Sequence, residues 1–321
     1  LIPGLNPVVP IVYGWAALVI ALAVHEGAHA TLARSLGFRV KSTGLLLLMV
    51  LPIGAFAEVD EKQLKGSSAI KGVRVLAAGP GSNLIVAGAA LVALTLLVFS
   101  LSPLTNGFGV TAVDVDSPIY KAGVQPMDML TSIDGIPVKS SSSLREAILS
   151  YAPGDTLQIV VLKSDSDYQQ NKILLELAPD PNNSSIPYLG VAGVGIEESI
   201  TNYIQHIPLS YLVVPTISSN QHRIPFSDTM HQFYNSPIGD LHHSVMNLLF
   251  WVWFVNFNVA IFNALPIYPL DGGQAFRMTL RSTMKDFLSE SSSSKITAAL
   301  TLAIVAIIFS IIILPYIPLI L

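Results

Sequence analysis

The chain has no cysteine, and only 12% of its 321 residues are charged. The lack of cysteine excludes disulfide bonds and thiolate zinc sites, so a bound metal would need histidine, carboxylate or backbone oxygen ligands. Soluble domains carry roughly 25% charged residues. The shortage of charge, beside a hydrophobic content of 51%, therefore predicts an integral membrane protein in contact with the lipid bilayer. The small net charge of −4 argues against a nucleic-acid partner.

Long apolar runs predict the membrane architecture. A helical span needs roughly 20 apolar residues, and the runs at about 8–36, 73–101 and 245–268 meet that length, with a last helix expected at 296–314. The run at 44–57 is too short to span and contains proline and glycine, which indicates a re-entrant, β-like element. We expect a multi-pass α-helical membrane protein with this re-entrant β-like element and an inserted soluble α+β domain.

The chain divides into four predicted parts. Residues 1–106 form an N-terminal membrane core, and residues 244–321 form a C-terminal one. Residues 107–200 alternate apolar and polar positions in short runs broken by turn signals, which is typical of a strand-rich soluble domain. Residues 201–243 have no clear periodicity, so we expect an irregular or amphipathic connection with solvated histidines. These scattered histidines are His206, His222, His231, His242 and His243.

Basic residues orient these parts through the positive-inside rule. They crowd two loops, which we expect to be cytoplasmic: Arg34, Arg39, Lys41, Lys62, Lys65, Lys71 and Arg74 in one, and Arg277, Arg281, Lys285 and Lys295 in the other. The soluble domain then lies on the non-cytoplasmic side of a cell membrane. No basic segment precedes the first apolar run, so no cleavable signal peptide is expected, and a chain that starts at leucine is expected to lack upstream residues.

An H-E-x-x-H pattern at residues 25–29 lies in the first apolar run. On a helix, His25 and His29 share one face and can bind one metal ion, while Glu26 stands beside it as a candidate general base. Ionisable groups inside a membrane are costly and by default mark a functional site. The alternative is a polar cluster at a helix end that reaches the membrane interface.

Asp271 is the candidate third ligand, since two histidines leave a catalytic zinc ion one protein ligand short. The alternative is an Asp-Gly turn, or an N-cap for a helix over 272–288. Asn263 and Asn83 are candidates for positioning a substrate, or for binding backbone carbonyls instead. The Gly79-Pro80-Gly81 stretch indicates close helix packing.

Together these motifs resemble the site-2 protease family of intramembrane metalloproteases. The resemblance rests on the H-E-x-x-H pattern, on Gly79-Pro80-x-x-Asn83, and on Asn263-x-x-Pro266-x-x-x-x-Asp271-Gly272, in that order along the chain. The opening residues 2–6 and the run 263–272 are closest to the branch of the sterol-regulated site-2 protease, and the compact insert favours a prokaryotic, archaeal member. The resemblance implies Zn²⁺ held by His25, His29 and Asp271, and Glu26 as general base. It also implies substrates that are membrane-anchored proteins with a single transmembrane helix, already trimmed by a first protease.

The soluble insert resembles the PDZ module of cell-envelope proteases, through Ser117-Pro118 and the run from Ala122 to Gly135. Such a module binds peptide C-termini by strand addition. A role as a size filter is the alternative. We also expect that residues 45–50 of the re-entrant element pair with an unwound substrate.

Two other functions would use the same features. A metal-ion transporter or sensor would also carry His and Asp in membrane helices, but it needs no general base at position 26. An inactive membrane scaffold would bind protein tails through the PDZ-like insert and hold no metal.

Overall fold

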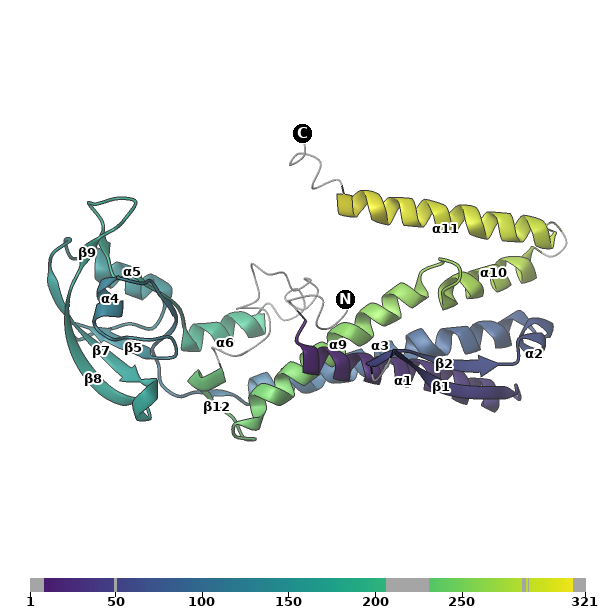
Figure 1. Ribbon diagram of the computed structural model, residues 1–321, viewed down its shortest axis with the longest axis horizontal. Coiled ribbons are helices and arrows are strands. Elements are labelled where there is room, and N and C mark those ends of the chain that lie inside the picture. Colours follow the sequence, from purple (N-terminus) through teal and green to yellow (C-terminus); the bar gives the residue numbers. More distant parts are fainter. Residues whose placement is uncertain (1–8, 49–50, 206–230, 285–286, 288, 314–321) are drawn as a thin grey trace. The chain divides into compact units, whose positions relative to one another are not determined.

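The computed structural model describes the chain except residues 1–8, 49–50, 206–230, 285–286, 288 and 314–321 (Figure 1). The chain forms two compact units. The first, which we call the helical unit, comprises Leu1–Val92 and Leu248–Leu321. The second, which we call the inserted unit, comprises Ala93–Asn247. Each unit is described by itself.

Three helices of the described residues are long and apolar enough to cross a membrane: α1 (Ile11–Ser35), α3 (Ala69–Phe99) and α9 (Leu241–Ala264). Each coincides with a predicted span to within a few residues. α10 (Asp271–Thr283) and α11 (Glu290–Ile313) follow them in the chain. The described part of α11 includes a shorter apolar stretch, 291–307, at the predicted last helix.

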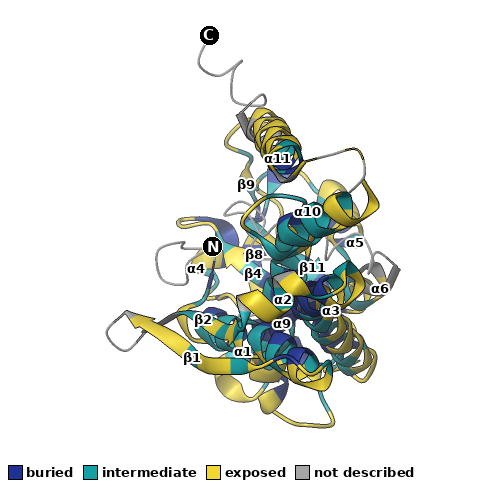
Figure 2. Cartoon of the chain, turned by 90° about the vertical axis from the view of Figure 1, so that its right-hand side faces the viewer, coloured by how far each residue is buried: buried dark blue, intermediate teal, exposed yellow. Residues whose placement is uncertain are grey.

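Small residues let α1 pack closely, because every buried position of this helix other than the two histidines is alanine or glycine. The helix ends where Gly37 adopts a φ of +85° and the backbone N–H groups of Gly37 and Phe38 donate to carbonyl groups in the last turn. On α3, large apolar side chains remain exposed, as expected for a helix in contact with lipid (Figure 2). They include Leu84, Ile85, Val92, Leu96 and Phe99.

The segment after α1 is a β-hairpin, in agreement with the predicted β-like element. β1 (Val40–Leu48) pairs antiparallel with β2 (Leu51–Val59), in a register that sets Thr43 opposite Ala57. β1 is largely exposed (Figure 2), whereas β2 packs against α1. The short helix α2 (Glu61–Gly66) follows, and the Asp60 carboxylate caps it by accepting from the backbone N–H groups of Lys62 and Gln63.

A six-stranded sheet forms the core of the inserted unit, with strand order β11-β4-β5-β7-β8 and β6 paired to β5. Its strands are β4 (Phe108–Val113), β5 (Met129–Ile133), β6 (Ile136–Pro137), β7 (Thr156–Lys163), β8 (Gln169–Glu176) and β11 (Val191–Gly195). Two helices, α4 (Pro118–Lys121) and α5 (Ser141–Leu149), contribute to a core rich in valine, isoleucine and leucine. The structure therefore contains strands where short alternating runs predicted them.

Short elements complete the inserted unit. They are β3 (Ser102–Pro103) paired with β12 (Tyr234–Asn235), β9 (Ala178–Pro179) paired with β10 (Pro187–Tyr188), the 3₁₀ turns η1 (Ser164–Ser166) and η3 (His231–Phe233), and α6 (Ile196–Gln205).

The connection over 201–243, predicted as irregular or amphipathic, is helical at both of its ends. α6, an amphipathic helix, continues to Gln205, and α9 begins at Leu241. Residues 206–230 lie outside the described residues, so the prediction stays untested there. The prediction of solvated histidines is wrong for His242, which is 4% exposed. Its Nδ1 lies 2.8 Å from the Gly239 carbonyl oxygen and its Nε2 lies 3.2 Å from the His231 carbonyl oxygen, so backbone groups replace water. His206 and His222 lie outside the described residues.

A buried ion pair connects β5 with β7. Asp128 is 1% exposed, and the Lys163 Nζ donates to its Oδ2 at 2.7 Å. The backbone N–H groups of Gln125 and Ser164 donate to the same carboxylate, so its charge is fully paired. Asp128, which lies in the run from Ala122 to Gly135, thus stabilises the fold.

Candidate active site

Two histidines of α1 project from one face of the helix. His25 and His29 are four residues apart, and their ring centroids lie 4.8 Å apart at an interplanar angle of 78°. Both are buried, with 6% and 8% exposure. An i, i+4 pair on a helix is the arrangement that two ligands of one metal ion require.

Asp271 is far from the histidine pair in the sequence but contacts it in the structure. Its Oδ2 lies 3.0 Å from His25 Nε2 and 3.2 Å from His29 Nε2. Asp271 is the first residue of α10, and Leu270 occupies the N-cap position without a side-chain cap. The N-cap alternative for Asp271 is therefore wrong, and its carboxylate points to α1 instead.

A tight turn fixes where Asp271 stands. A Cβ atom at Gly272 would lie 2.3 Å from the Ala264 carbonyl oxygen, so only glycine allows the chain to fold back this closely. The Gln274 Nε2 donates to the Pro269 carbonyl at 2.9 Å, and the Tyr268 N–H donates to the Thr301 Oγ1 of α11 at 3.1 Å. Backbone packing, rather than side-chain flexibility, therefore determines the position of the carboxylate.

A backbone carbonyl of α3 orients the His29 ring. The Val75 carbonyl oxygen lies 2.7 Å from His29 Nδ1, so Nδ1–H donates to it and Nε2 is directed to Asp271. His25 presents Nε2 to the same carboxylate, and its buried Nδ1 has no hydrogen-bond partner among the described residues. Both imidazoles thus direct Nε2 to one point.

The three side chains fit a zinc ion. Their ligand atoms lie within 4.8 Å of one another, and they form the one such group of three in the part of the chain that the structure describes. Two atoms bound to one tetrahedral zinc ion lie roughly 3.3 Å apart at the usual bond lengths, close to the observed 3.0 and 3.2 Å. Burial raises the pKa of Asp271, but hydrogen bonds with His25 and His29 outweigh it and lower that pKa to about 2. Asp271 is therefore a carboxylate at neutral pH, the form that binds metal.

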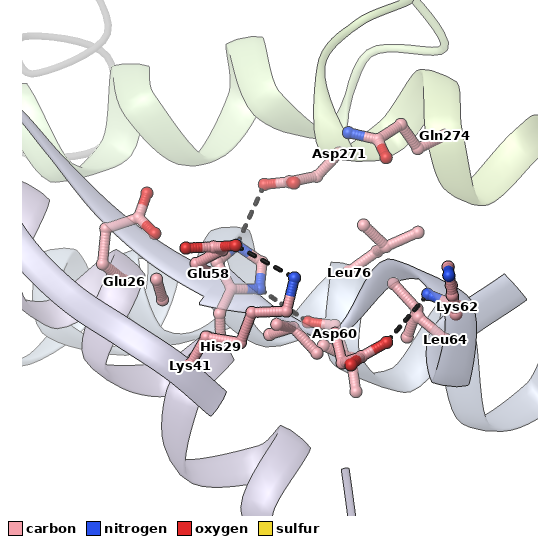
Figure 3. A pocket seen from close by; sticks show the side chains of 13 residues that line it. Glu26, His29, Lys41, Glu58, Asp60, Lys62, Leu64, Leu76, Asp271 and Gln274 are labelled. Atoms are coloured by element: carbon pink, nitrogen blue, oxygen red, sulfur yellow. Dashed lines mark hydrogen bonds and ion pairs between the residues drawn. The ribbon is translucent and has the colours of Figure 1, made fainter. Parts of the chain in front are cut away.

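A cavity of about 630 Å³, which we call the site cavity, opens beside this group. Glu26, His29 and Asp271 line it together (Figure 3). Residues 57–59 of β2 form another wall, and Gln274 of α10 lies one turn beyond Asp271. Glu26 is half-buried there, so its carboxylate shares one polar space with two of the candidate ligands, His29 and Asp271.

Charged side chains surround the mouth of the site cavity. The Lys41 Nζ donates to Glu58 at 3.1 Å across the hairpin, and this hydrogen bond holds the pKa of Glu58 below its usual value. Both side chains are about half exposed (45% and 51%), so the pair adds little stability. The part of the hairpin that lines the cavity is thus polar, so the cavity can hold water.

The two candidate positioning residues do not line the site cavity. Asn83 is fully buried, and its Nδ2 donates to the Ala21 carbonyl at 3.3 Å, which connects α3 to α1. The Asn263 Nδ2 donates to the Val259 carbonyl of its own helix at 3.1 Å. Their predicted role in holding substrate stays a prediction.

Sequence reasoning missed three contributors to the site. The Val75 carbonyl carries no sequence signal, because any residue offers the same group. Residues 57–59 of β2 are set beside Glu26 only by tertiary packing. Gln274, in contrast, has a signal in its position one turn after Asp271 on the same helix.

A second cavity, of about 510 Å³, lies in the inserted unit between α5 and β11, and we call it the α5 groove. Apolar side chains of α5, including Leu144, Ile148 and Leu149, form one wall, and residues 186–193 form the other. β11 is the last strand of its sheet, so it can add a further strand. Its preceding turn is held by a hydrogen bond from Tyr188 to Asp114, which raises the pKa of Tyr188 to about 12.

Known proteins similar to this chain include several proteases. Uncharacterized protein MJ0971 of Methanocaldococcus jannaschii is 29% identical over 286 residues, which are 88% of this chain and 62% of that protein. Putative zinc metalloprotease CPE1693 of Clostridium perfringens is 22% identical, over 83% of this chain and 86% of that protein. Zinc metalloprotease RasP of Shouchella clausii is 26% identical, over 73% of this chain and 58% of that protein. The chain thus spans less than two thirds of the first and third of these relatives.

Among solved structures, the PDZ domain of the SdrC-like protein Lmo2051 from Listeria monocytogenes is 26% identical, with a TM-score of 0.25. The match covers 29% of this chain and 93% of that domain.

The family comparison spans the helical unit and the inserted unit alike. A model of peptidase family M50 matches residues 13–309, a range that includes the histidine pair, Glu26 and Asp271. This confirms the resemblance seen in the motifs, and with it the peptidase class. The chain belongs to peptidase family M50, the site-2 protease family.

Proposed function

We propose that this protein is an intramembrane zinc metalloprotease that hydrolyses peptide bonds in or near the transmembrane segments of membrane-anchored proteins. One observation carries the proposal: the ligand atoms of His25 and His29, on a helix apolar enough to cross a membrane, and of Asp271 lie within 4.8 Å of one another, and Glu26 lines a cavity with His29 and Asp271. Zinc is the proposed metal because two imidazoles and one carboxylate form a typical catalytic donor set with one position left open.

Each residue has a distinct part in the proposed reaction. When bound, zinc lowers the pKa of water towards neutrality and polarises a carbonyl group. Glu26 takes the proton from the attacking water and delivers it to the nitrogen of the leaving amine. Val75 keeps the His29 ring in its required tautomer through the hydrogen bond to Nδ1. Asp271 contributes negative charge, and the backbone of its turn prevents it from moving away.

The hairpin is the proposed binding element for an unwound substrate. A helix must become extended before its peptide bonds are accessible, and an extended segment can pair with a free strand edge. Residues 57–59 of β2 line the site cavity, which makes β2 a more direct candidate than the segment 45–50 expected from sequence. Residues 49–50 of that segment lie outside the described residues.

The α5 groove is the proposed site for peptide C-termini. Its apolar α5 wall and the unpaired edge of β11 provide side-chain contacts and backbone hydrogen bonds respectively. In this proposal the inserted unit is PDZ-like and non-cytoplasmic, while the site cavity opens near the cytoplasmic face of the cell membrane.

Incubation of the purified protein with a panel of single-transmembrane peptides tests the function. We expect cleavage within or next to the apolar segment, found by mass spectrometry, and loss of cleavage with a zinc chelator. A transporter would instead move zinc into sealed vesicles and leave every peptide intact. A scaffold would do neither and would contain no zinc by elemental analysis, so each alternative predicts a different result.

A further inference from the structure

One face of α3 contacts α1 along the whole length of the histidine site. The contacts recur at Val75, Ser82 and Asn83: the Val75 carbonyl accepts from His29, the Ser82 Oγ lies 3.3 Å from the Val24 carbonyl oxygen, and Asn83 donates to the Ala21 carbonyl. Positions 75, 79, 82 and 83 follow the i, i+4, i+7, i+8 spacing of a single helix face. Gly79 therefore stands at the centre of the face that covers the histidines.

Gly79 is in unusually close contact with both imidazoles. A Cβ atom added there would lie 2.4 Å from His29 Nε2, 2.6 Å from His25 Nε2 and 2.7 Å from His25 Cε1. Non-bonded heavy atoms prefer roughly 3.5 Å or more, so a methyl group would overlap both rings by about 1 Å. The two nitrogen atoms that it would meet are the proposed metal ligands.

The rings have little freedom to move away. Both are buried, and His29 is additionally held at Nδ1 by the Val75 carbonyl. By contrast, a Cβ atom at Gly81 or at Gly88, on the same helix, would have nothing within 4 Å. Close contact with the histidines is therefore a property of position 79 and not of every glycine on α3.

We infer that Gly79 is a positioning residue of the metal site: its missing side chain leaves the space in which the Nε2 atoms of His25 and His29 converge on the ion. This inference rests on the proposed function, because it assigns those two atoms to zinc. It adds a second role to the Gly79-Pro80-Gly81 stretch, for which the sequence favoured helix packing. Metal ligands must stay within a few tenths of an ångström of their binding positions. Displacing either ring would move its Nε2 atom out of that range.

Zinc retention by matched alanine variants provides the first test. Wild type, Gly79→Ala, Gly81→Ala and Gly88→Ala are purified in detergent and titrated with a zinc chelator, and bound zinc is measured by elemental analysis. We expect Gly79→Ala to lose zinc at chelator concentrations at least about tenfold lower than wild type, as for other groups that orient metal ligands. Gly81→Ala and Gly88→Ala should retain zinc like wild type. Equal retention by Gly79→Ala would overturn the inference.

A double-mutant cycle provides the second test and needs no zinc. Alanine forms helices better than glycine does, so Gly79→Ala should raise thermal stability unless it clashes. We expect it to lower the melting temperature of the metal-free protein but to have no such effect when His25→Ala and His29→Ala are also present. An equal loss in both backgrounds would assign Gly79 to backbone packing alone and refute the inference. If Gly79→Ala alone does not fold, recovery of folded protein in the histidine-free background supports the inference, and failure to fold in both refutes it.

The two tests separate the inference from the proposed function. If wild type binds no zinc, the proposed function fails, yet the metal-free cycle still decides whether Gly79 positions the rings. If wild type binds zinc and cleaves peptides while Gly79→Ala does both equally well, only the inference about Gly79 fails.

Discussion

The Oδ2 atom of Asp271 lies 3.0 Å from Nε2 of His25, although 246 positions separate the two residues in the chain. Neither residue is part of a local motif that contains the other. The site therefore forms only when α10 packs beside α1, so metal binding and correct folding of the helical unit are coupled.

Replacing Asp271 by asparagine should remove most bound zinc. The amide lacks the negative charge of a carboxylate and binds zinc poorly, so we expect affinity to fall by more than about 100-fold. Elemental analysis of the purified variant after dialysis measures this. Asp240→Asn, at an exposed position of the inserted unit, is the matched control and should keep the metal. One zinc ion per chain in Asp271→Asn would show that Asp271 is not a ligand.

Replacing Glu26 by glutamine should separate zinc binding from catalysis. Glutamine keeps the size of the side chain but cannot accept a proton, so we expect zinc content to be unchanged and cleavage to fall by about 100- to 10,000-fold. Mass spectrometry of peptide products and elemental analysis measure the two quantities. Glu176→Gln, exposed on β8 in the inserted unit, should cleave normally. Undiminished cleavage by Glu26→Gln would rule out the general-base role.

Proline substitutions should identify the strand that binds substrate. Proline removes a backbone N–H, so at a strand edge it prevents one hydrogen bond with an added strand. We expect Val59→Pro to reduce cleavage of transmembrane peptides at least about tenfold, and Leu46→Pro to reduce it less. Zinc content, measured in parallel, shows whether the metal site is intact. A greater loss with Leu46→Pro would move the substrate to β1, and normal cleavage by both would exclude the hairpin.

A charged side chain in the α5 groove should weaken peptide binding by the inserted unit. Leu149 is 49% exposed and lines the groove, so Leu149→Glu changes the surface without removing a core contact. We expect the Kd for a fluorescent peptide with an apolar free C-terminus to rise at least about tenfold, measured by anisotropy on the full chain. Leu174→Glu, 69% exposed on β8, is the control with the same change of charge. Equal binding by wild type and Leu149→Glu would favour the size-filter alternative.

The absence of cysteine makes the membrane topology directly testable. Ser184 in the inserted unit and Ser282 in α10 are both exposed, so Ser184→Cys and Ser282→Cys each introduce a single reactive thiol. We expect a membrane-impermeant maleimide to label Ser184→Cys in intact cells, and Ser282→Cys only after the membrane is opened. The opposite pattern would invert the proposed orientation.

Local sequence patterns predicted the helices and strands well, because each of these elements has its own periodicity in the sequence. The apolar period places His25 and His29 on one helix face, and short alternating runs mark the strands of the inserted unit. Boundaries of α1, α3 and α9 shift by a few residues, as caps and frayed ends allow.

Contacts between segments far apart in the chain could not be predicted from the sequence. Asp271 has the local signature of an N-cap, and only the backbone turn at Gly272 directs its carboxylate to α1. His242 lies in a polar segment, yet the fold buries it, with a backbone carbonyl beside each of its ring nitrogens. The proximity of Gly79 to both imidazoles also depends on how α3 meets α1, which no pattern within either helix records.

The hydrogen bond between His29 and the carbonyl of Val75 has a consequence for mutational studies. Every amino acid carries a carbonyl, so exchanging the Val75 side chain would change packing and leave the contact in place. Mutagenesis of side chains would therefore not detect this contribution, because every substitution at position 75 keeps the carbonyl that accepts from His29. Only a change to the main chain itself would expose it, such as an ester in place of the amide between residues 75 and 76, which makes the carbonyl a weaker acceptor.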